Sequence, residues 1–202
     1  MINALNIQRE ALIAASIPFV LEHGWCEKAL FETSVYLNKD PAYWGMFFPD
    51  ISAAVEFFER SEDARMLCEM CKLGEIDGIR NKIGKALFER IVNISGGAPM
   101  LKRLEGFYFG VRAPSAVKSI WNTADVIWLF AGDKATDFNH YSKRTLLSGV
   151  YVAVVKRMLR NGEMDIQRYI VDTLDKVVKF GNVKKYLKLP KMEDIPILRM
   201  FC

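Results

Sequence analysis

The sequence predicts an all-α fold, a bundle of about nine or ten helices. Several long segments repeat apolar residues every three or four positions, which is the spacing of a helix with one buried face. No stretch alternates apolar and polar residues between hairpin turns, as a half-buried strand would. With 51% hydrophobic and 26% charged residues, the 202-residue chain has the composition of a globular protein with a sizeable core. We therefore expect one all-helical structural unit.

Residues 1–50 predict short helices joined by tight turns. The first helix is expected from about residue 6 and should bend or end near Pro18. A second is expected over 26–37, and a short third over 41–49, with Asp40 as its N-cap. A fourth helix should begin after Asp50. This spacing predicts a helix-turn-helix-like head.

The rest of the chain predicts longer helices. Their apolar faces lie over residues 76–94, 117–131, 147–158 and 166–178. Pro114 favours the start of the second of these helices, and Gly132 favours its end. We expect a head over 1–50, a body over 51–181 and a basic amphipathic tail over 182–202, with head and body forming one structural unit.

The cellular compartment is inferred from sequence features that we do not find. No apolar run approaches the roughly 18 residues of a membrane span, and the densest run covers 146–155. The start of the chain has no cationic region followed by an apolar core and a cleavage site, so no secretion signal is expected. Four cysteines in a chain of this length do not suggest a disulfide framework. We expect a reduced, cytoplasmic protein.

The charge distribution argues against DNA binding. The head resembles that of TetR-type regulators, and the matching positions are Arg9, Leu12, Ala14, Ala15, Gly24, Ala29, Leu30, Tyr43 and Phe47. Residues 1–70, however, carry five Lys and Arg against eleven Asp and Glu, a net charge of −6, whereas residues 71–202 carry +10. Residues 40–50 contain no Lys or Arg. Because phosphate contacts supply most non-specific DNA affinity, we expect no nucleic-acid partner; a TetR-type regulator with an apolar ligand is the alternative.

The cysteine pair Cys68 and Cys71 is expected to be structural. It falls near the C-terminal end of a helix, where the helix dipole does not lower a thiol pKa. The favoured interpretation is that both cysteines are small side chains that face the core. A zinc site would need four ligands, which His23 and Cys26 could complete, and this alternative stays open.

Residues 132–144, GDKATDFNHYSKR, collect polar side chains at a helix start. Asp137 and His140 are spaced three apart, as in di-iron bundles, but those need a second copy and further carboxylates. Asp137, His140 and Ser142 lie within one helical turn and cannot easily meet at one substrate atom. We expect no enzyme activity, no cofactor and no metal.

The same region carries a family resemblance. In order along the chain are the segments 124–128 (ADVIW), 131–133 (AGD), 136–141 (TDFNHY), 143–144 (KR) and 149–151 (GVY), and the head adds 12–15 (LIAA), 24–25 (GW) and 48–49 (FP). This pattern resembles the lipid-binding accessory protein family of coenzyme Q (ubiquinone) biosynthesis, in a bacterial member. The resemblance implies a TetR-like all-α fold without DNA binding, a homodimer, and peripheral association with the inner face of the cell membrane.

The resemblance also implies the partners. The family binds isoprenoid quinone precursors and presents them to the di-iron hydroxylase that acts on demethoxyubiquinone. Its docking surface corresponds here to Asp137, Asn139, His140 and Tyr141. Many relatives have Trp where this chain has His140, which alters the apolar character of that position.

Large apolar side chains are available for a lipid pocket. The candidates are Phe107, Phe109, Trp121, Trp128, Leu147 and Tyr151. Taken one at a time, each of them also fits the alternative of an ordinary core residue.

The tail predicts membrane contact through a short basic amphipathic segment. Its candidates are Lys184, Lys185, Tyr186, Leu187 and Lys188. The alternative is a solvated basic tail.

Overall fold

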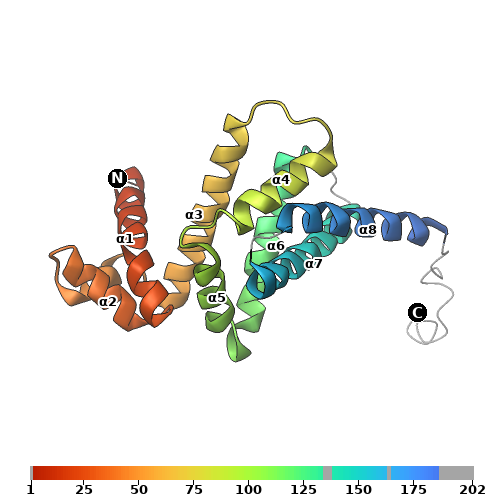
Figure 1. Cartoon of the computed structure of the whole chain (residues 1–202). Helices are drawn as coiled ribbons and strands as arrows, with labels where there is room; N and C mark the ends of the chain where they lie inside the picture. Colours follow the sequence, from red (N-terminus) through yellow and green to blue (C-terminus); the bar gives the residue numbers. More distant parts are fainter. Residues whose placement is uncertain (1, 134–137, 163–164, 187–202) are drawn as a thin grey trace, which may run out of the picture.

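The computed structural model describes residues 2–133, 138–162 and 165–186. These residues form eight α-helices and two short 3-10 helices, and no strand occurs among them. The all-α prediction and its helix count are thus confirmed. Figure 1 shows a small head at one end of the molecule, a long helix leading away from it, and a body built around the other end of that helix. The arrangement is that of a TetR-type regulator.

The head consists of α1 (Ile2–His23), α2 (Glu27–Tyr36) and the 3-10 helix η1 (Pro41–Met46). Helix α1 does not end near Pro18, because it continues through that residue to His23. Asp40 is the N-cap of η1, as predicted, and its carboxylate accepts a hydrogen bond from Ala42 N at 2.8 Å. The third helix is thus a short 3-10 segment.

One helix exceeds the apolar length expected from the sequence. By length and composition alone, Ala4–His23 could cross a membrane. The expectation that no apolar segment approaches the length of a membrane span is therefore wrong. In this fold the segment belongs to α1, which buries Leu12, Ile13 and Val20 and contacts α2.

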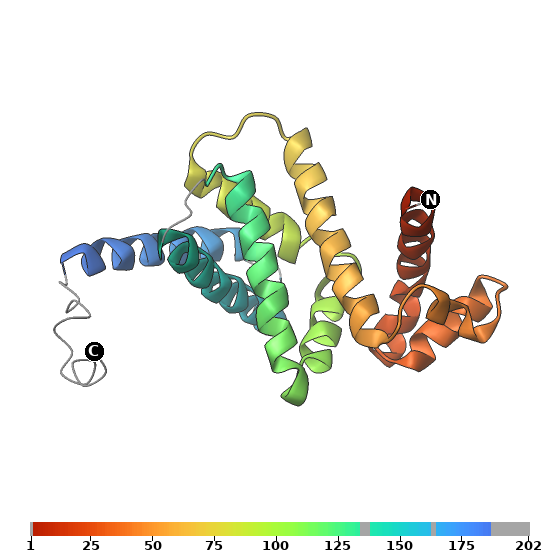
Figure 2. The same ribbon diagram turned by 180° about the vertical axis from the view of Figure 1, so that it is seen from behind.

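The body is built on α3 (Ile51–Lys72), whose N-cap Asp50 accepts a hydrogen bond from Ala53 N at 2.8 Å. The elements that follow are α4 (Ile79–Ile91), α5 (Gly97–Phe107), η2 (Gly110–Arg112), α6 (Ala113–Phe130), α7 (Phe138–Asn161) and α8 (Ile166–Tyr186). Helix α6 packs against α3 and α7, and α8 packs against α4 and α7 (Figure 2). The N-terminal ends of α6 and of α3 both lie on the lower side of the molecule in that view.

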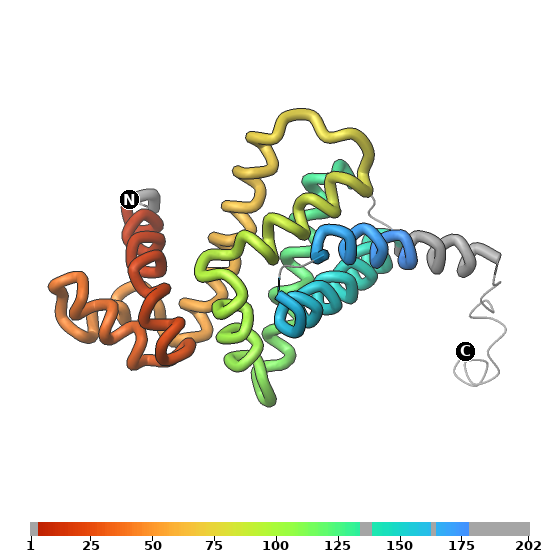
Figure 3. The backbone as a smooth tube through the Cα atoms, in the orientation of Figure 1, coloured from red at the N-terminus to blue at the C-terminus, as the bar shows by residue number. Residues whose placement is uncertain are grey.

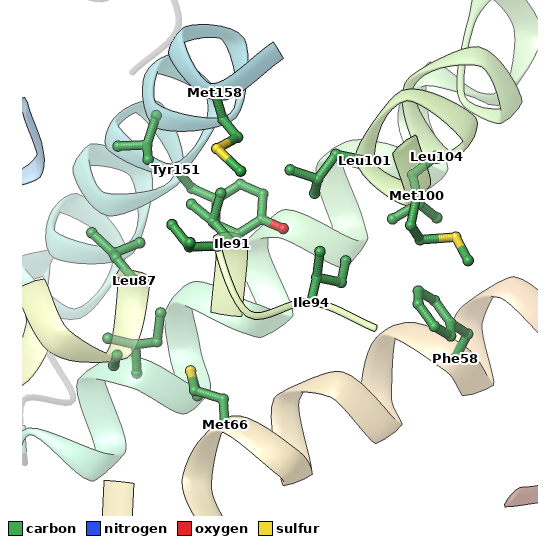
Figure 4. Packing of buried hydrophobic residues seen from close by; sticks show 14 of the residues in the cluster. Phe58, Met66, Leu87, Ile91, Ile94, Met100, Leu101, Leu104, Tyr151 and Met158 are labelled. Atoms are coloured by element: carbon green, nitrogen blue, oxygen red, sulfur yellow. The ribbon is translucent and has the colours of Figure 1, made fainter. Parts of the chain in front are cut away.

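A continuous core joins these helices. Figure 4 shows the part where α3, α4, α5 and α7 meet, and it includes Phe58, Met66, Leu87, Ile91, Ile94, Met100, Leu101, Leu104, Tyr151 and Met158. All of these side chains are buried. The core continues into the head through Trp25, whose ring lies 5.2 Å from that of Phe58, so head and body share one core.

The structure corrects the prediction for the cysteine pair. Cys68 and Cys71 are exposed, not core-facing, because Met66 and Met70 occupy the buried face of α3 in that region. His23 bonds Glu32 at 2.8 Å in the head, at the opposite end of α3 from the two cysteines (Figure 1). The zinc alternative is therefore wrong, because His23 does not lie close to Cys68 and Cys71.

Helix α8 crosses the expected boundary between body and tail. It runs from Ile166 to Tyr186 without a break at residue 181, alongside α7 at its beginning (Figure 3). Lys184, Lys185 and Tyr186 belong to its last turns. Leu187 and Lys188, the other two membrane-contact candidates, lie outside the described residues.

Candidate functional site

The α6–α7 corner, which we define by Asp125, Trp128, Asp133, Lys143 and Arg144, is held by buried ion pairs. The Arg144 side chain is 1% exposed and pairs with Asp125 and, at 3.1 Å, with Asp133. It also donates a hydrogen bond to the His140 carbonyl at 3.1 Å, within the first turn of α7. One buried guanidinium thus ties the end of α6 to the start of α7.

A second set of contacts supports the same corner. The Trp128 indole Nε1 donates to the Lys143 carbonyl at 3.1 Å, and the Lys143 ammonium lies 5.2 Å from the Trp128 ring centre. Lys143 also pairs with Asp133 at 2.6 Å. Arg144 is buried and Lys143 bridges two helices, because both have carboxylate partners on the α6 side of the corner.

The predicted docking residues lie directly beside this corner. Asn139 and Tyr141 are exposed and His140 is half-buried, whereas Asp137 lies outside the described residues. The Tyr141 side chain is 60% exposed, and its ring centre lies 6.2 Å from Trp121 and 5.2 Å from His140. Trp121, predicted for the lipid pocket, is half-buried and contributes to this aromatic surface instead. A partly exposed aromatic cluster on an ordered helix is suited to protein recognition.

A cavity of about 360 Å³ opens between α4, α6, α7 and α8, and we call it the Trp128 cavity. It contains two of the predicted pocket residues, Trp128 and Leu147. Its lining residues are Ile79, Arg80, Ile83, Trp128, Lys143, Leu146, Leu147, Val150, Leu174 and Val177. Only Arg80 and Lys143 among them are charged, so the cavity suits an apolar ligand of modest size.

A smaller cavity of about 190 Å³ lies between α5, α6 and α7, and we call it the Tyr151 cavity. Its wall is mainly aliphatic, from Leu101, Leu104, Ala116, Ile120, Val152 and Val155. Tyr108 and Glu59 form a polar end, where the Tyr108 hydroxyl donates to the Glu59 carboxylate at 2.6 Å. Burial raises the pKa of the Tyr151 phenol to about 12. Burial, together with the Glu59 carboxylate, raises the pKa of the Tyr108 phenol as well, so both phenols are neutral at ordinary pH.

Behind the Tyr151 cavity lies a polar network that sequence reasoning missed. Arg90 is fully buried and pairs with Asp63 at 2.6 Å, and the Thr123 hydroxyl donates to the same carboxylate at 2.9 Å. Burial opposes the charge of Arg90, but the Tyr151 phenol and the Asp63 carboxylate raise its pKa above the ordinary value. The signal in the sequence was a group of acids on the apolar face of α3, at Glu59, Glu62 and Asp63.

The six predicted pocket residues do not line one pocket. Trp128 and Leu147 share one cavity, and Tyr151 lines the other. Phe107 is buried and packs edge-on against Tyr108 at 5.2 Å. Phe109 is 86% exposed, which contradicts its assignment to the pocket. Helix α5 ends at Phe107, and the turn that follows directs Phe109 to solvent.

Comparison with known proteins agrees with the resemblance seen in the sequence. The COQ9 family model matches residues 113–181, which hold α6, α7 and most of α8. Rat "Ubiquinone biosynthesis protein COQ9, mitochondrial" is 24% identical over 88% of this chain and 61% of its own length. The bovine protein of that name is 23% identical over 88% and 59%, and "Probable ubiquinone biosynthesis protein coq9, mitochondrial" of Dictyostelium discoideum is 25% identical over 85% and 61%.

The chain thus spans about three-fifths of the length of these curated relatives. The region that the family model matches contains the α6–α7 corner, Tyr141 and much of the wall of both cavities. The relatives, in contrast, align with most of the present chain, head included. The chain is therefore similar to COQ9 proteins over most of its length, and to the COQ9 family model over residues 113–181.

Proposed function

We propose that this chain is a non-enzymatic accessory protein of ubiquinone biosynthesis, which binds an isoprenoid quinone precursor and presents it to the demethoxyubiquinone hydroxylase. The names of its relatives support the pathway. The observation that supports presentation is that the same two helices, α6 and α7, form both the Trp128 cavity and the exposed aromatic surface. Trp128 and Lys143 line the cavity, and Trp121 and Tyr141 pair at the surface.

This arrangement supports transfer between two proteins. A lipid in the Trp128 cavity would lie against the α6–α7 corner, and a partner on the Tyr141 surface would contact the same corner from outside. The corner is ordered by buried ion pairs, so the distance between lipid and partner would be fixed by the fold. We propose that Asp137, Asn139, His140 and Tyr141 contact the partner.

We also propose a homodimer that associates peripherally with the membrane. The lipids that it would carry partition into bilayers, so a carrier has to work at the bilayer surface. Lys184, Lys185, Tyr186, Leu187 and Lys188 are proposed to contribute through attraction to anionic headgroups. In a bacterial cell this surface is the inner face of the cell membrane.

A reconstituted reaction tests the proposal. The hydroxylase, its reductant and demethoxyubiquinone in vesicles are combined with and without this protein. We expect the initial rate of hydroxylation to rise with the protein's concentration and then to saturate, and Tyr141→Ala to lower that response. A hydroxylation rate that does not depend on this protein's concentration would contradict the accessory role.

The TetR-type regulator remains the second candidate because α2 and η1 have a helix-turn-helix arrangement. DNA binding by this head is unfavourable, because the carboxylates of Asp40 and Asp50 already accept hydrogen bonds from backbone N–H groups at the starts of η1 and α3. Such N–H groups are common phosphate donors in DNA complexes. Titration against DNA from upstream of the protein's own gene, at several salt concentrations, separates the two candidates; we expect no specific binding.

A further inference from the structure

The turn between α5 and α6 places two apolar side chains in solvent. Phe109 is 86% exposed and Val111 is 94% exposed, on either side of Gly110. All residues from 109 to 115 are exposed. We call residues 109–112 the α5–α6 tip. Figures 1 and 2 both show it at the lower extremity of the body, beyond the neighbouring helices. Neighbouring exposed apolar side chains on a projecting turn mark a candidate interaction site.

The surroundings of the tip are mainly basic. Arg112 belongs to the tip, and its guanidinium lies 4.6 Å from the ring centre of Phe107. Lys156 lines the Tyr151 cavity, and Arg160 follows one turn later on α7; both are exposed. The acidic residues that line this cavity are Glu105, which is exposed, and Glu59, which is buried. Lysines and arginines beside exposed apolar side chains fit a surface of anionic lipid headgroups.

The shape of the tip also favours a bilayer over a protein. Two side chains on a convex turn offer much less area than the roughly 800 Å² per partner of a standard protein interface. A fluid acyl region, in contrast, adapts to a small protrusion and takes up apolar side chains individually.

The tip is adjacent to a cavity mouth. Tyr108, directly before Phe109, lines the Tyr151 cavity, as do Ala116 and Ile120 on the first turns of α6. We propose that the α5–α6 tip inserts Phe109 and Val111 into the anionic bilayer and thereby holds the mouth of the Tyr151 cavity at the membrane surface. The role of this mouth as a lipid entrance rests on the proposed function, whereas insertion of the tip does not.

Vesicle flotation of the full chain tests the insertion. The vesicles contain phosphatidylcholine with or without phosphatidylglycerol. We expect Phe109→Ser combined with Val111→Ser to weaken binding to the anionic vesicles roughly tenfold to a hundredfold. Both side chains are exposed, so circular dichroism and the melting temperature should not change. The control is Leu129→Ser, a 58% exposed apolar residue at the other end of α6, and it should bind as the parent does.

A fluorescent reporter localises the contact. Val111→Cys, in a background where Cys68, Cys71 and Cys202 are Ser, is labelled with an environment-sensitive dye. We expect its emission to shift to the blue on vesicles and to be quenched by lipids spin-labelled in the acyl chain. Vesicle binding without a shift would overturn the proposal and indicate that another segment makes the contact, as would equal binding by the double variant. Extraction of lipid from the purified double variant tests the proposed lipid binding separately from the insertion of the tip.

Discussion

Replacement of Tyr141 by alanine separates recognition from folding. The Tyr141 side chain is 60% exposed and contacts Trp121 and His140 through its ring, at centroid distances of 6.2 and 5.2 Å. An aromatic pair contributes about 0.5–1.5 kcal/mol to stability. For a chain of this size, Tyr141→Ala should therefore lower the melting temperature by only about 1–6 °C.

The expected effect on partner binding is larger. An aromatic side chain at the centre of an interface commonly contributes about 2 kcal/mol or more, which corresponds to a dissociation constant roughly 30-fold higher. Calorimetric titration of the hydroxylase with the parent and with Tyr141→Ala measures this change, with the melting temperature recorded on the same samples.

Tyr36 provides a matched control. It is a tyrosine on a helix of the head, 67% exposed, with one ring contact to Phe19 at 5.7 Å. Tyr36→Ala should lose similar stability and keep the affinity for the hydroxylase. Equal affinities for the two variants would refute the docking role of Tyr141. Unfolding of Tyr141→Ala alone would show that this residue is part of the structural core.

Four further predictions follow from the cavities, the corner and the exposed thiols. Ile79→Trp, at a 54% exposed position on the wall of the Trp128 cavity, should lower the amount of copurifying isoprenoid lipid seen by mass spectrometry without lowering the melting temperature. Arg144→Met removes the buried guanidinium from Asp133, which keeps Lys143 as a partner, and should reduce the unfolding free energy by about 1.5–3 kcal/mol in urea titration; unchanged stability would contradict the role given to the corner. Because the pKa of Tyr151 rises from 10.0 to about 12 on folding, its contribution to stability is complete below pH 10 and is lost as the pH rises to about 12, and Tyr151→Phe should remove part of that loss. Cys68 should react with a thiol reagent in the native protein as fast as in the unfolded one, and protection would contradict its exposure.

Much of the fold could be predicted from local patterns. Pro114 and Gly132 bracket α6 as expected, and the caps at Asp40 and Asp50 are both present. Helix α5 was missed, since it is short and begins at two glycines, Gly96 and Gly97, which are poor helix formers. Gly96 has φ 84°, and a Cβ there would meet Met100 Cβ at 3.1 Å, so its conformation serves the helix start directly.

The candidate site was predicted in part. Trp128 and Leu147, two of the apolar candidates, line one cavity, and Tyr141 is at the surface; their roles in binding stay predictions. The spacing of residues in the sequence could not predict that Arg144 and Arg90 are buried, because their carboxylate partners lie 11 to 27 residues away along the chain. Phe109 was misassigned because apolar character does not reveal whether a residue after a helix end turns inward or outward.

Lipid identification is the most direct test of the central claim. The protein is purified from its own host under mild conditions, and native mass spectrometry is followed by extraction and identification of any bound lipid. The account predicts an isoprenoid quinone precursor bound to the parent protein and a reduced amount bound to Ile79→Trp. The absence of isoprenoid lipid from the parent, under conditions that keep other non-covalent complexes intact, would contradict the proposed function.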